Sequence, residues 1–472
     1  MASRTGKLVK NTVILGFGQF LPRLLALITL PILTAALSTS DYGIYDLILS
    51  MEGLIMPLMT LQIQQGIFRK IIQYGEKKAS EIISTAFFFV LTSMLIWCPV
   101  IFIIFKFAVG YTSGVSITIY LFFVFCSLFD VFGQTCRGIG YNSKYSVGIV
   151  LYSVLNTLFL VFLYKADKVT IISVLGSSLV AYFVACIYYI VSAKIYKRVN
   201  RKLLSNTELK NLLSYSVPII PSSIALWIVN LSDRLLVTFF LGTSLNGIYA
   251  VANKIPNLFA SVYSVFNLAW TETAARVMDK DSDADAYYER MFDMLFGFLS
   301  GAMLVLISIT PVLFRILINI KFDESYQQIP ILFMGVFFNC IVSFFGGIYV
   351  AKQQTKQVGY SSLAGAVINF VVNIALIRSV GLYAASVSTV VAFLIISIYR
   401  MIDVKKYVKI HYNYRKISIC MAAMIVYCVM AAQRNTLLNM VLFILAIGFN
   451  LIINKEMISV MMNKVKKQKR ND

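Results

Sequence analysis

Charge is scarce in this sequence. Only 13% of its 472 residues are Asp, Glu, Lys or Arg, against roughly 25% in soluble domains. Hydrophobic residues make up 59% and mean hydropathy is +0.79. Apolar runs of about 20 residues recur along the chain, the length that crosses a roughly 30 Å hydrocarbon layer as helix. The composition therefore excludes a water-soluble fold and predicts an all-α membrane protein with many spans.

Residues that carry common enzyme chemistry are scarce as well. The single histidine, His411, excludes HExxH metallopeptidases and His-dependent triads. The seven cysteines have neither the paired spacing of a zinc site nor the density of a disulfide scaffold. No Gly-x-x-x-x-Gly-Lys-Ser/Thr phosphate loop occurs, which excludes an ATP-driven pump working alone. We therefore expect no catalytic residue, no metal and no cofactor.

Apolar runs between polar breaks give fourteen candidate membrane helices. The thirteenth is only 16 residues long, so a core of twelve spans followed by a terminal pair remains an alternative to fourteen spans. The candidates are residues 11–37, 42–68, 82–105, 112–136, 145–164, 169–193, 211–241, 247–275, 290–318, 326–351, 357–377, 380–399, 417–432 and 436–454.

The formal net charge of +21 has a one-sided distribution. Of 42 Lys and Arg residues, 32 fall in the N-terminus, the even-numbered loops and the C-terminus, with Arg290 at the edge of its span counted in the loop, and 6 in the odd-numbered loops. The positive-inside rule then predicts that both termini are cytoplasmic. These cations would meet anionic membrane lipids and imply no nucleic-acid partner. Four cations fall inside predicted helices: Arg23, Arg234, Lys254 and Arg315.

The chain contains an internal repeat. At an offset of 204 residues, positions 31–45 align without a gap with positions 235–249, and seven of the fifteen pairs are identical. The offset places predicted helices one to six over helices seven to twelve. Because each half has an even number of spans, the two halves share one orientation, as in transporters built from parallel repeats.

This repeat predicts the domain organisation. Residues 1–193 form an N-terminal lobe of six helices, and residues 211–410 form a matching C-terminal lobe. The Lys/Arg-rich segment 194–210 is a cytoplasmic linker between them, and residues 411–472 supply a C-terminal helix pair and a basic tail. We expect a central cavity between the two lobes, because substrate sites of such transporters lie at the repeat interface.

Arginines at membrane depth are the main candidates for substrate binding. A charge at the centre of a membrane helix costs about 2.5–3.5 kcal/mol, so such residues usually face a cavity or a partner. Arg234 aligns with Leu30, seven residues from Arg23 and on roughly the same helix face. Arginine binds phosphate well because its planar guanidinium forms bidentate hydrogen bonds. We therefore expect Arg23, Arg234 and Lys254 to bind an anionic head group.

Acidic and amide residues accompany these cations. Supporting polar residues of the same site are predicted at Glu52, Gln62, Asn230 and Asp233. The alternative for intramembrane acids is structural pairing within a helix, and the spacing of Asp130 and Arg137 favours such a pair.

Two segments carry a family resemblance. The opening stretch contains the pattern Q-x-x-x-R-L-x-x-L-x-x-L-P at Gln19–Pro31 and L-S-x-x-D-Y-G-x-Y at Leu37–Tyr45. It resembles the start of bacterial polysaccharide transporters, the O-antigen and repeat-unit flippases (Wzx-like) of the multidrug/oligosaccharidyl-lipid/polysaccharide exporter superfamily. The segment Arg234–Tyr249 is similar to the opening of that family's second half. The resemblance covers roughly residues 8–410.

The resemblance implies a function. Such proteins move an undecaprenyl-diphosphate-linked oligosaccharide, an O-antigen (lipopolysaccharide) or capsule repeat unit, from the inner to the outer leaflet of the bacterial cytoplasmic membrane by alternating access. They hold the anionic head in a cationic cavity, and an H⁺ or Na⁺ gradient supplies the energy. A glycan polymerase and a chain-length regulator are the implied protein partners. Onto this sequence the resemblance carries Arg23 and Arg234 as head-group contacts.

Three other functions remain as alternatives. A peptidoglycan-precursor flippase or a multidrug cation antiporter of the same superfamily would share the architecture. An antiporter would favour unpaired carboxylates in its cavity, whereas this chain offers arginines. A membrane glycan polymerase would carry catalytic residues on a sizeable external loop, but the odd-numbered loops here are short.

Overall fold

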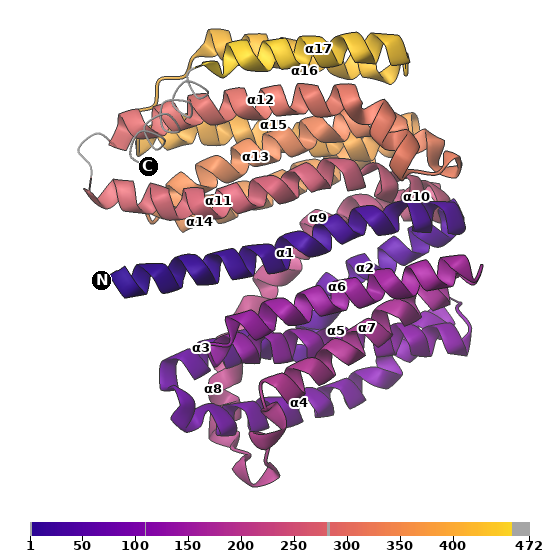
Figure 1. Cartoon of the computed structure of the whole chain (residues 1–472), viewed down its shortest axis with the longest axis vertical. Helices are drawn as coiled ribbons and strands as arrows, with labels where there is room; N and C mark the ends of the chain where they lie inside the picture. Colours follow the sequence, from indigo (N-terminus) through magenta and orange to yellow (C-terminus); the bar gives the residue numbers. More distant parts are fainter. Residues whose placement is uncertain (1, 109, 281–283, 456–472) are drawn as a thin grey trace, which may run out of the picture. The chain divides into compact units, whose positions relative to one another are not determined.

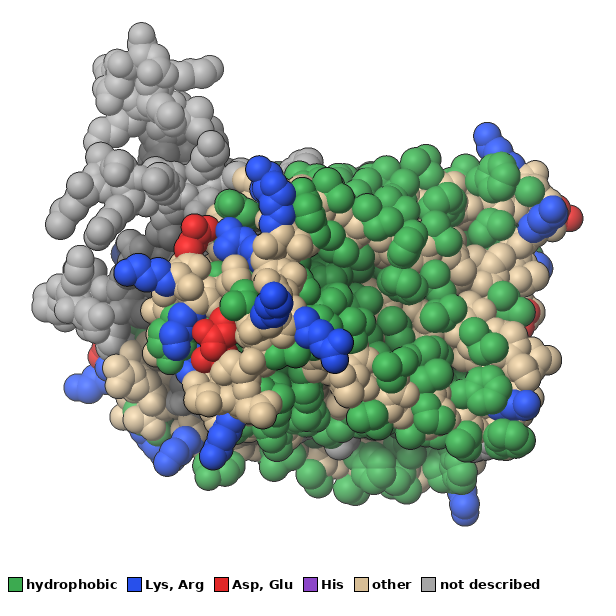
Figure 2. All heavy atoms as spheres, turned by 90° about the horizontal axis from the view of Figure 1, so that it is seen from below, with side chains coloured by type: hydrophobic (Ala, Val, Ile, Leu, Met, Phe, Trp, Pro, Cys, Tyr) green, Lys and Arg blue, Asp and Glu red, His purple; other side chains and the backbone are tan. Residues whose placement is uncertain are grey.

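The computed structural model describes residues 2–108, 110–280 and 284–455, and every regular element in that part of the chain is helical (Figure 1). The chain forms two compact units, Met1–Leu231 and Ser232–Asp472. Eleven helices among the described residues are long and apolar enough to cross a membrane. The face seen in Figure 2 carries a broad field of hydrophobic side chains, with most Lys and Arg side chains toward its ends. The predicted all-α membrane fold is confirmed.

In the first unit, α1 lies along α6, and α7 packs against both α5 and α6. The short α8 packs on α3 and α4. The helices of this unit are α1 (Ala2–Ala36), α2 (Thr39–Thr60), α3 (Ile63–Tyr74), α4 (Glu76–Ile103), α5 (Ser113–Gly138), α6 (Asn142–Lys165), α7 (Ile171–Ser192), α8 (Asn206–Ser216) and the first part of α9 (Ile220–Leu241).

In the second unit, α13 lies between α11 and α15, and α14 packs on α15. Two further helices, α16 and α17, pack against α12. Besides the remainder of α9, the unit contains α10 (Thr243–Ala252), α11 (Lys254–Lys280), α12 (Ala284–Leu317), α13 (Ile329–Ala351), α14 (Thr355–Val380), α15 (Tyr383–Asp403), α16 (Tyr414–Ala432) and α17 (Thr436–Ile453).

The two units share one scheme of helix pairing. In the first unit α3 packs on α5, α5 on α7, and α6 on α7. The second unit repeats these pairings as α11 on α13, α13 on α15, and α14 on α15. This correspondence is what the sequence repeat predicts. The central cavity between lobes stays a prediction.

The span expected at 211–241 covers the end of α8 and all of α9. Two other predicted spans are also each divided into two helices. The span expected at 42–68 breaks at Leu61 and Gln62, whose φ angles of 47° and 57° are left-handed, a conformation that L-residues rarely adopt. The span expected at 247–275 breaks at Asn253, after which α11 begins. Pro256 follows in the first turn of α11, where a missing N–H costs little. Apolar character runs through both breaks, so hydropathy did not reveal them.

The basic segment 194–210 is fixed to the first unit. The Ser84 hydroxyl donates to the Arg198 carbonyl at 3.0 Å and accepts from the Asn200 N–H at 2.9 Å. The Arg198 guanidinium pairs with Glu76 at 3.0 Å. The boundary between the two compact units lies after this segment in the chain, within α9, between Leu231 and Ser232. The predicted basic tail lies outside the described residues beyond 455.

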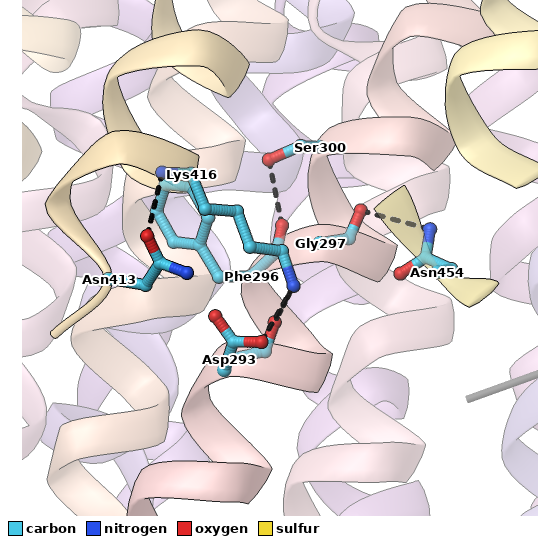
Figure 3. A network of polar contacts seen from close by, with 7 residues as sticks. All are labelled: Asp293, Phe296, Gly297, Ser300, Asn413, Lys416 and Asn454. Atoms are coloured by element: carbon cyan, nitrogen blue, oxygen red, sulfur yellow. Dashed lines mark hydrogen bonds and ion pairs between the residues drawn. The ribbon is translucent and has the colours of Figure 1, made fainter. Parts of the chain in front are cut away.

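The C-terminal pair is fastened to α12 at one end by the polar network of Figure 3. Lys416 Nζ donates to the Asp293 carboxylate at 2.8 Å and to the Asp293 carbonyl at 2.9 Å. Asn454 Nδ2 donates to the Gly297 carbonyl at 3.3 Å. At the other end, Arg434 forms two bonds of 2.6 and 2.7 Å to the Asp323 carboxylate. The pair is therefore held by charges as well as by apolar packing.

One cation that the sequence predicts in a loop is buried inside a helix. Arg400, expected in a cytoplasmic loop, lies inside α15 with 2% of its surface exposed. It forms five hydrogen bonds to neutral oxygen atoms of α13 and α14: the carbonyls of Val342 and Val358 and the hydroxyls of Ser361 and Ser362. Helix α15 extends beyond the predicted end at residue 399, so Arg400 lies within the helix. Its side chain therefore connects α15 to α13 and α14.

Candidate functional site

The predicted head-group cations are distributed over both units. Arg23 is half-buried on α1, in the first unit. Arg234 on α9 and Lys254 at the start of α11 are half-buried in the second unit. Arg234 interacts electrostatically with Tyr249. All three cations are thus partly withdrawn from solvent.

Asp233 lies in a dense polar cluster of the second unit. Its carboxylate is 9% exposed. It accepts hydrogen bonds from Asn373 Nδ2 at 2.7 Å, Thr389 Oγ1 at 2.8 Å, the Tyr249 hydroxyl at 3.1 Å and Asn369 Nδ2 at 3.5 Å. The donors come from α10, α14 and α15, so one carboxylate gathers three neighbouring helices around α9. The role of Asp233 as a supporting residue of the head-group site stays a prediction.

The same cluster is rich in oxygen atoms. The Asn373 side chain is completely buried, and its Oδ1 has no hydrogen-bond partner among the described residues. Thr389 Oγ1 also lies 2.9 Å from the Ala385 carbonyl. Carboxylate, amide, hydroxyl and carbonyl oxygens are the ligands that hard cations prefer. An orphaned buried acceptor beside a carboxylate fits a cation-binding site.

A second polar cluster lies inside the first unit. Glu52 on α2 interacts with the Cys126 thiol and, at longer range, with Asp130, both on α5. Glu52 and Asp130 are both half-buried, so solvent reaches them. Two carboxylates from different helices therefore lie near each other within one unit.

A chain of amides runs from this acidic pair to α9. Asp130 interacts with Gln64 and with Gln134, whose Nε2 lies 3.4 Å from Asp130 Oδ1. Gln64 Nε2 donates to Gln62 Oε1 at 3.1 Å, and Gln62 Nε2 donates to the Ser223 hydroxyl at 3.1 Å. Gln62, one of the two left-handed residues at the α2–α3 break, thus connects α3 to α9 through its bonds to Gln64 and Ser223.

Asp130 and Arg137 are joined indirectly. Gln134 Oε1 accepts from Arg137 Nη1 at 3.1 Å, while its Nε2 faces Asp130. The amide therefore stands between the carboxylate and the guanidinium. The Arg137 guanidinium is also placed over the rings of Phe68 and Tyr145, at 4.7 and 5.3 Å from their centroids.

The structure distributes the predicted residues over both units. It brings Glu52 and Gln62 into one cluster of the first unit through Gln64 and Asp130, and it places Asp233, next to Arg234 in the chain, in a cluster of the second unit. The Asn230 side chain lies outside the described part. Sequence analysis missed Asn369, Asn373 and Thr389. The i, i+4 spacing of the two asparagines on an apolar helix was the only signal that could have marked them.

Comparison with known proteins decides the family. A family model described as "Polysaccharide biosynthesis protein" matches residues 8–271, more than half of the chain. The chain belongs to this family. Its place in the multidrug/oligosaccharidyl-lipid/polysaccharide exporter superfamily follows from this match together with its fold. A comparison with curated proteins found no match.

Solved transporters share the fold. The structure "Lipid II flippase MurJ, inward closed conformation" superposes with a TM-score of 0.74 at 12% identity, covering 95% of this chain and 100% of that chain. An inward-facing multidrug resistance MATE transporter of the same superfamily gives 0.62 at 12% identity, covering 84% and 95%. A superfamily transporter from Pyrococcus furiosus gives 0.52 at 12% identity, again covering 84% and 95%. This member of the polysaccharide biosynthesis family is a multipass membrane protein that has the fold of these flippases and transporters.

Proposed function

We propose that this protein flips an undecaprenyl-diphosphate-linked oligosaccharide, an O-antigen or capsule repeat unit, from the inner to the outer leaflet of the bacterial cytoplasmic membrane. The observation that carries the proposal is the half-buried Arg23 on α1, inside the region matched by the polysaccharide biosynthesis family. A half-buried guanidinium can bind an anion through two parallel, charge-assisted hydrogen bonds. The diphosphate of a lipid-linked glycan supplies such an anion.

Head-group binding is assigned to Arg23, Arg234 and Lys254. Arginine keeps its charge at any physiological pH and presents a planar fork that matches phosphate oxygens, whereas Lys254 contributes a point charge. Half-burial strengthens each contact, because water screens a partly withdrawn charge less than an exposed one. The sugars would then extend away from these cations.

The coupling ion is assigned to the Asp233 cluster. Asp233, Asn369, Asn373 and Thr389 surround a buried position with oxygen atoms, and Ala385 adds a carbonyl. Asn and Gln amide orientations are inferred from their neighbours, so both asparagines can turn an oxygen inward when a cation is bound. The orphaned Asn373 Oδ1 favours Na⁺ over H⁺ in this cluster.

Gene deletion with complementation tests the function. Cells that lack the protein should lose surface glycan and accumulate complete lipid-linked repeat units in the inner leaflet. Arg23→Ala should reduce glycan display about tenfold or more, as expected for the loss of a charge-assisted bidentate contact. Arg69→Ala, which removes an exposed arginine of α3, is the matched control. Membrane abundance is measured for each variant.

Other outcomes would identify another function. Accumulation of a peptidoglycan precursor in the deletion strain, with normal surface glycan, would indicate a precursor flippase. Drug sensitivity without any glycan phenotype would indicate a multidrug antiporter. Repeat units that reach the outer leaflet but stay unpolymerised would indicate a glycan polymerase.

A further inference from the structure

The acidic cluster of the first unit, formed by Glu52 and Asp130, contains more hydrogen-bond acceptors than donors. Glu52 lies near the Cys126 thiol, a weak donor that bonds to the Met56 sulfur at 3.6 Å. Asp130 lies near the Gln64 amide and accepts from Gln134 Nε2 at 3.4 Å. The two oxygens of a carboxylate offer about four lone-pair positions. Within the described part of the chain, much of the acceptor capacity of the pair is therefore left unused.

Gln64 adds an unpaired acceptor at the same place. Its side chain is 3% exposed and contacts Asp130. Its Nε2 donates to Gln62 Oε1, while its Oε1 has no hydrogen-bond partner among the described residues. Leaving a buried acceptor unpaired costs about 1–3 kcal/mol, so such an atom indicates a missing donor. The feature is independent of the two carboxylates.

Aromatic rings border the acceptors. Tyr152 and Tyr182 stack with their ring centroids 4.0 Å apart. Tyr182 interacts with Cys126, the partner of Glu52, and Tyr152 is within electrostatic range of Glu52. Tyr152 is half-buried, which leaves part of its ring accessible. An apolar ring beside charged acceptors suits a ligand with a hydrophobic face and a hydroxylated edge.

We propose that Glu52, Asp130 and Gln64 form a subsite for the sugar hydroxyls of the transported glycan, with a pyranose ring packed against Tyr152. The inference rests on the proposed function and deepens it. Hydroxyl donors of a sugar would satisfy the free acceptors of these three side chains. Arg137, held to Asp130 through Gln134, balances part of the negative charge.

Glu52 and Asp130 are assigned to binding of the sugar and not of the diphosphate. Two carboxylates repel a phosphate group, so the head group is bound by the cationic residues and the glycan by the acidic subsite. Specificity follows from the same chemistry, because a site built to bind hydroxyl donors rejects a ligand that lacks them. The subsite therefore selects among lipid-linked substrates by the position of their hydroxyl groups.

The test compares two ligands on the full-length protein in lipid nanodiscs. One ligand is the lipid-linked glycan pool extracted from the deletion strain, and the other is undecaprenyl diphosphate without sugar. The double variant Glu52→Gln/Asp130→Asn keeps the side-chain volumes and removes both charges. It should weaken binding of the glycan-bearing ligand about tenfold and leave the sugar-free ligand within about twofold, since tenfold corresponds to about 1.4 kcal/mol. Asp167→Asn, at an exposed loop position, is the matched control.

A second variant distinguishes loss of the subsite from misfolding of the first variant. Tyr152→Leu removes the ring without touching the acids and should also weaken only the glycan-bearing ligand. Equal loss for both ligands, or no loss in either variant, would overturn the subsite. Wild-type protein that binds both ligands equally would also overturn it while leaving head-group recognition intact. Wild-type protein that binds neither ligand would overturn the proposed function itself.

Discussion

Asp233 illustrates how one residue organises a set of helices. Its carboxylate accepts from four neutral side chains on α10, α14 and α15. Burying a carboxylate is costly, and hydrogen bonds from neutral donors offset part of that cost. A cation bound at the proposed ion site would offset more of it. In that proposal, Asp233 would couple cation binding to the packing of the second unit.

Removing oxygen ligands should change the dependence on Na⁺. We expect Asp233→Asn and Thr389→Val to raise the Na⁺ concentration needed for half-maximal transport about tenfold or more, because each removes a ligand of a hard cation. The measurement is glycan flipping in proteoliposomes at varied Na⁺, with K⁺ keeping the ionic strength constant. Na⁺ should also raise the melting temperature of wild-type protein and not of Asp233→Asn.

Two control variants isolate the effect. Thr389→Ser keeps the hydroxyl and should retain Na⁺ dependence. Ser397→Ala removes a hydroxyl of the same helix that bonds only to the Leu394 carbonyl in the structure, and it should behave as wild type. Unchanged Na⁺ dependence in Asp233→Asn would contradict the site.

The sequence identified individual polar residues better than their partners. Asp233 was predicted from its position beside Arg234, yet Asn373 follows it by 140 residues and Thr389 by 156. Spacing along the chain cannot report contacts of that range. Arg400 was missed for a local reason: a positive charge at the end of an apolar run is taken as the start of a loop, although five hydrogen bonds can hold it inside a helix bundle.

At the level of elements, apolar periodicity predicted helices but not their interruptions. The break at Leu61–Gln62 occurs without glycine or proline, because hydrogen bonds from Gln62 and Gln64 stabilise the left-handed residues. The break at Asn253 is marked only by Pro256. The boundaries of the last span were close to prediction, because the span expected at 436–454 is α17, Thr436–Ile453. By contrast, α9 begins at Ile220, inside the span expected at 211–241.

Two glycines allow α17 to pack closely against α12. Gly297 and Gly301 form a Gly-x-x-x-Gly motif, which brings membrane helices into close approach. They face Asn454 and Asn450, which are also four residues apart. A methyl group at Gly301 would lie 2.6 Å from Asn450 Cγ, and one at Gly297 would lie 2.9 Å from Asn454 Oδ1.

Gly301→Ala should therefore destabilise the protein. We expect a loss of about 1–3 kcal/mol from overpacking, measured as a lower melting temperature in detergent. Gly448→Ala on α17 is the matched control, because a methyl group there meets nothing within 4 Å. The control should be neutral or slightly stabilising, since alanine favours helix by about 1 kcal/mol over glycine. Equal melting temperatures for both variants would contradict the close packing of α17 on α12.

For the whole molecule, the distribution of cations predicts orientation. The loop at Asp167 should face the outside and the basic segment containing Lys202 the cytoplasm, because 32 Lys and Arg fall on the predicted cytoplasmic side and 6 on the other. Helix α7 separates the two positions. Asp167→Cys should react with a membrane-impermeant maleimide in intact cells, and Lys202→Cys only after permeabilisation.

The unmodified chain provides the background for this labelling. Five of its seven cysteines are buried and the other two are half-buried, so weak reaction is expected without an added thiol. Reaction of Lys202→Cys in intact cells, with protection of Asp167→Cys, would invert the predicted topology.

The fastening of α16 and α17 to α12 also has a consequence for biogenesis. Asp293 lies 123 residues before Lys416. At a synthesis rate of about 5–20 residues per second, roughly 6–25 s pass before the ribosome makes the lysine that pairs with this aspartate. During that interval α12 presents Asp293 and its Gly-x-x-x-Gly surface without their final partners. The hairpin of α16 and α17 therefore completes these contacts of the second unit only after α12 has been made, and a chain that stops before Lys416 would leave Asp293 without this partner.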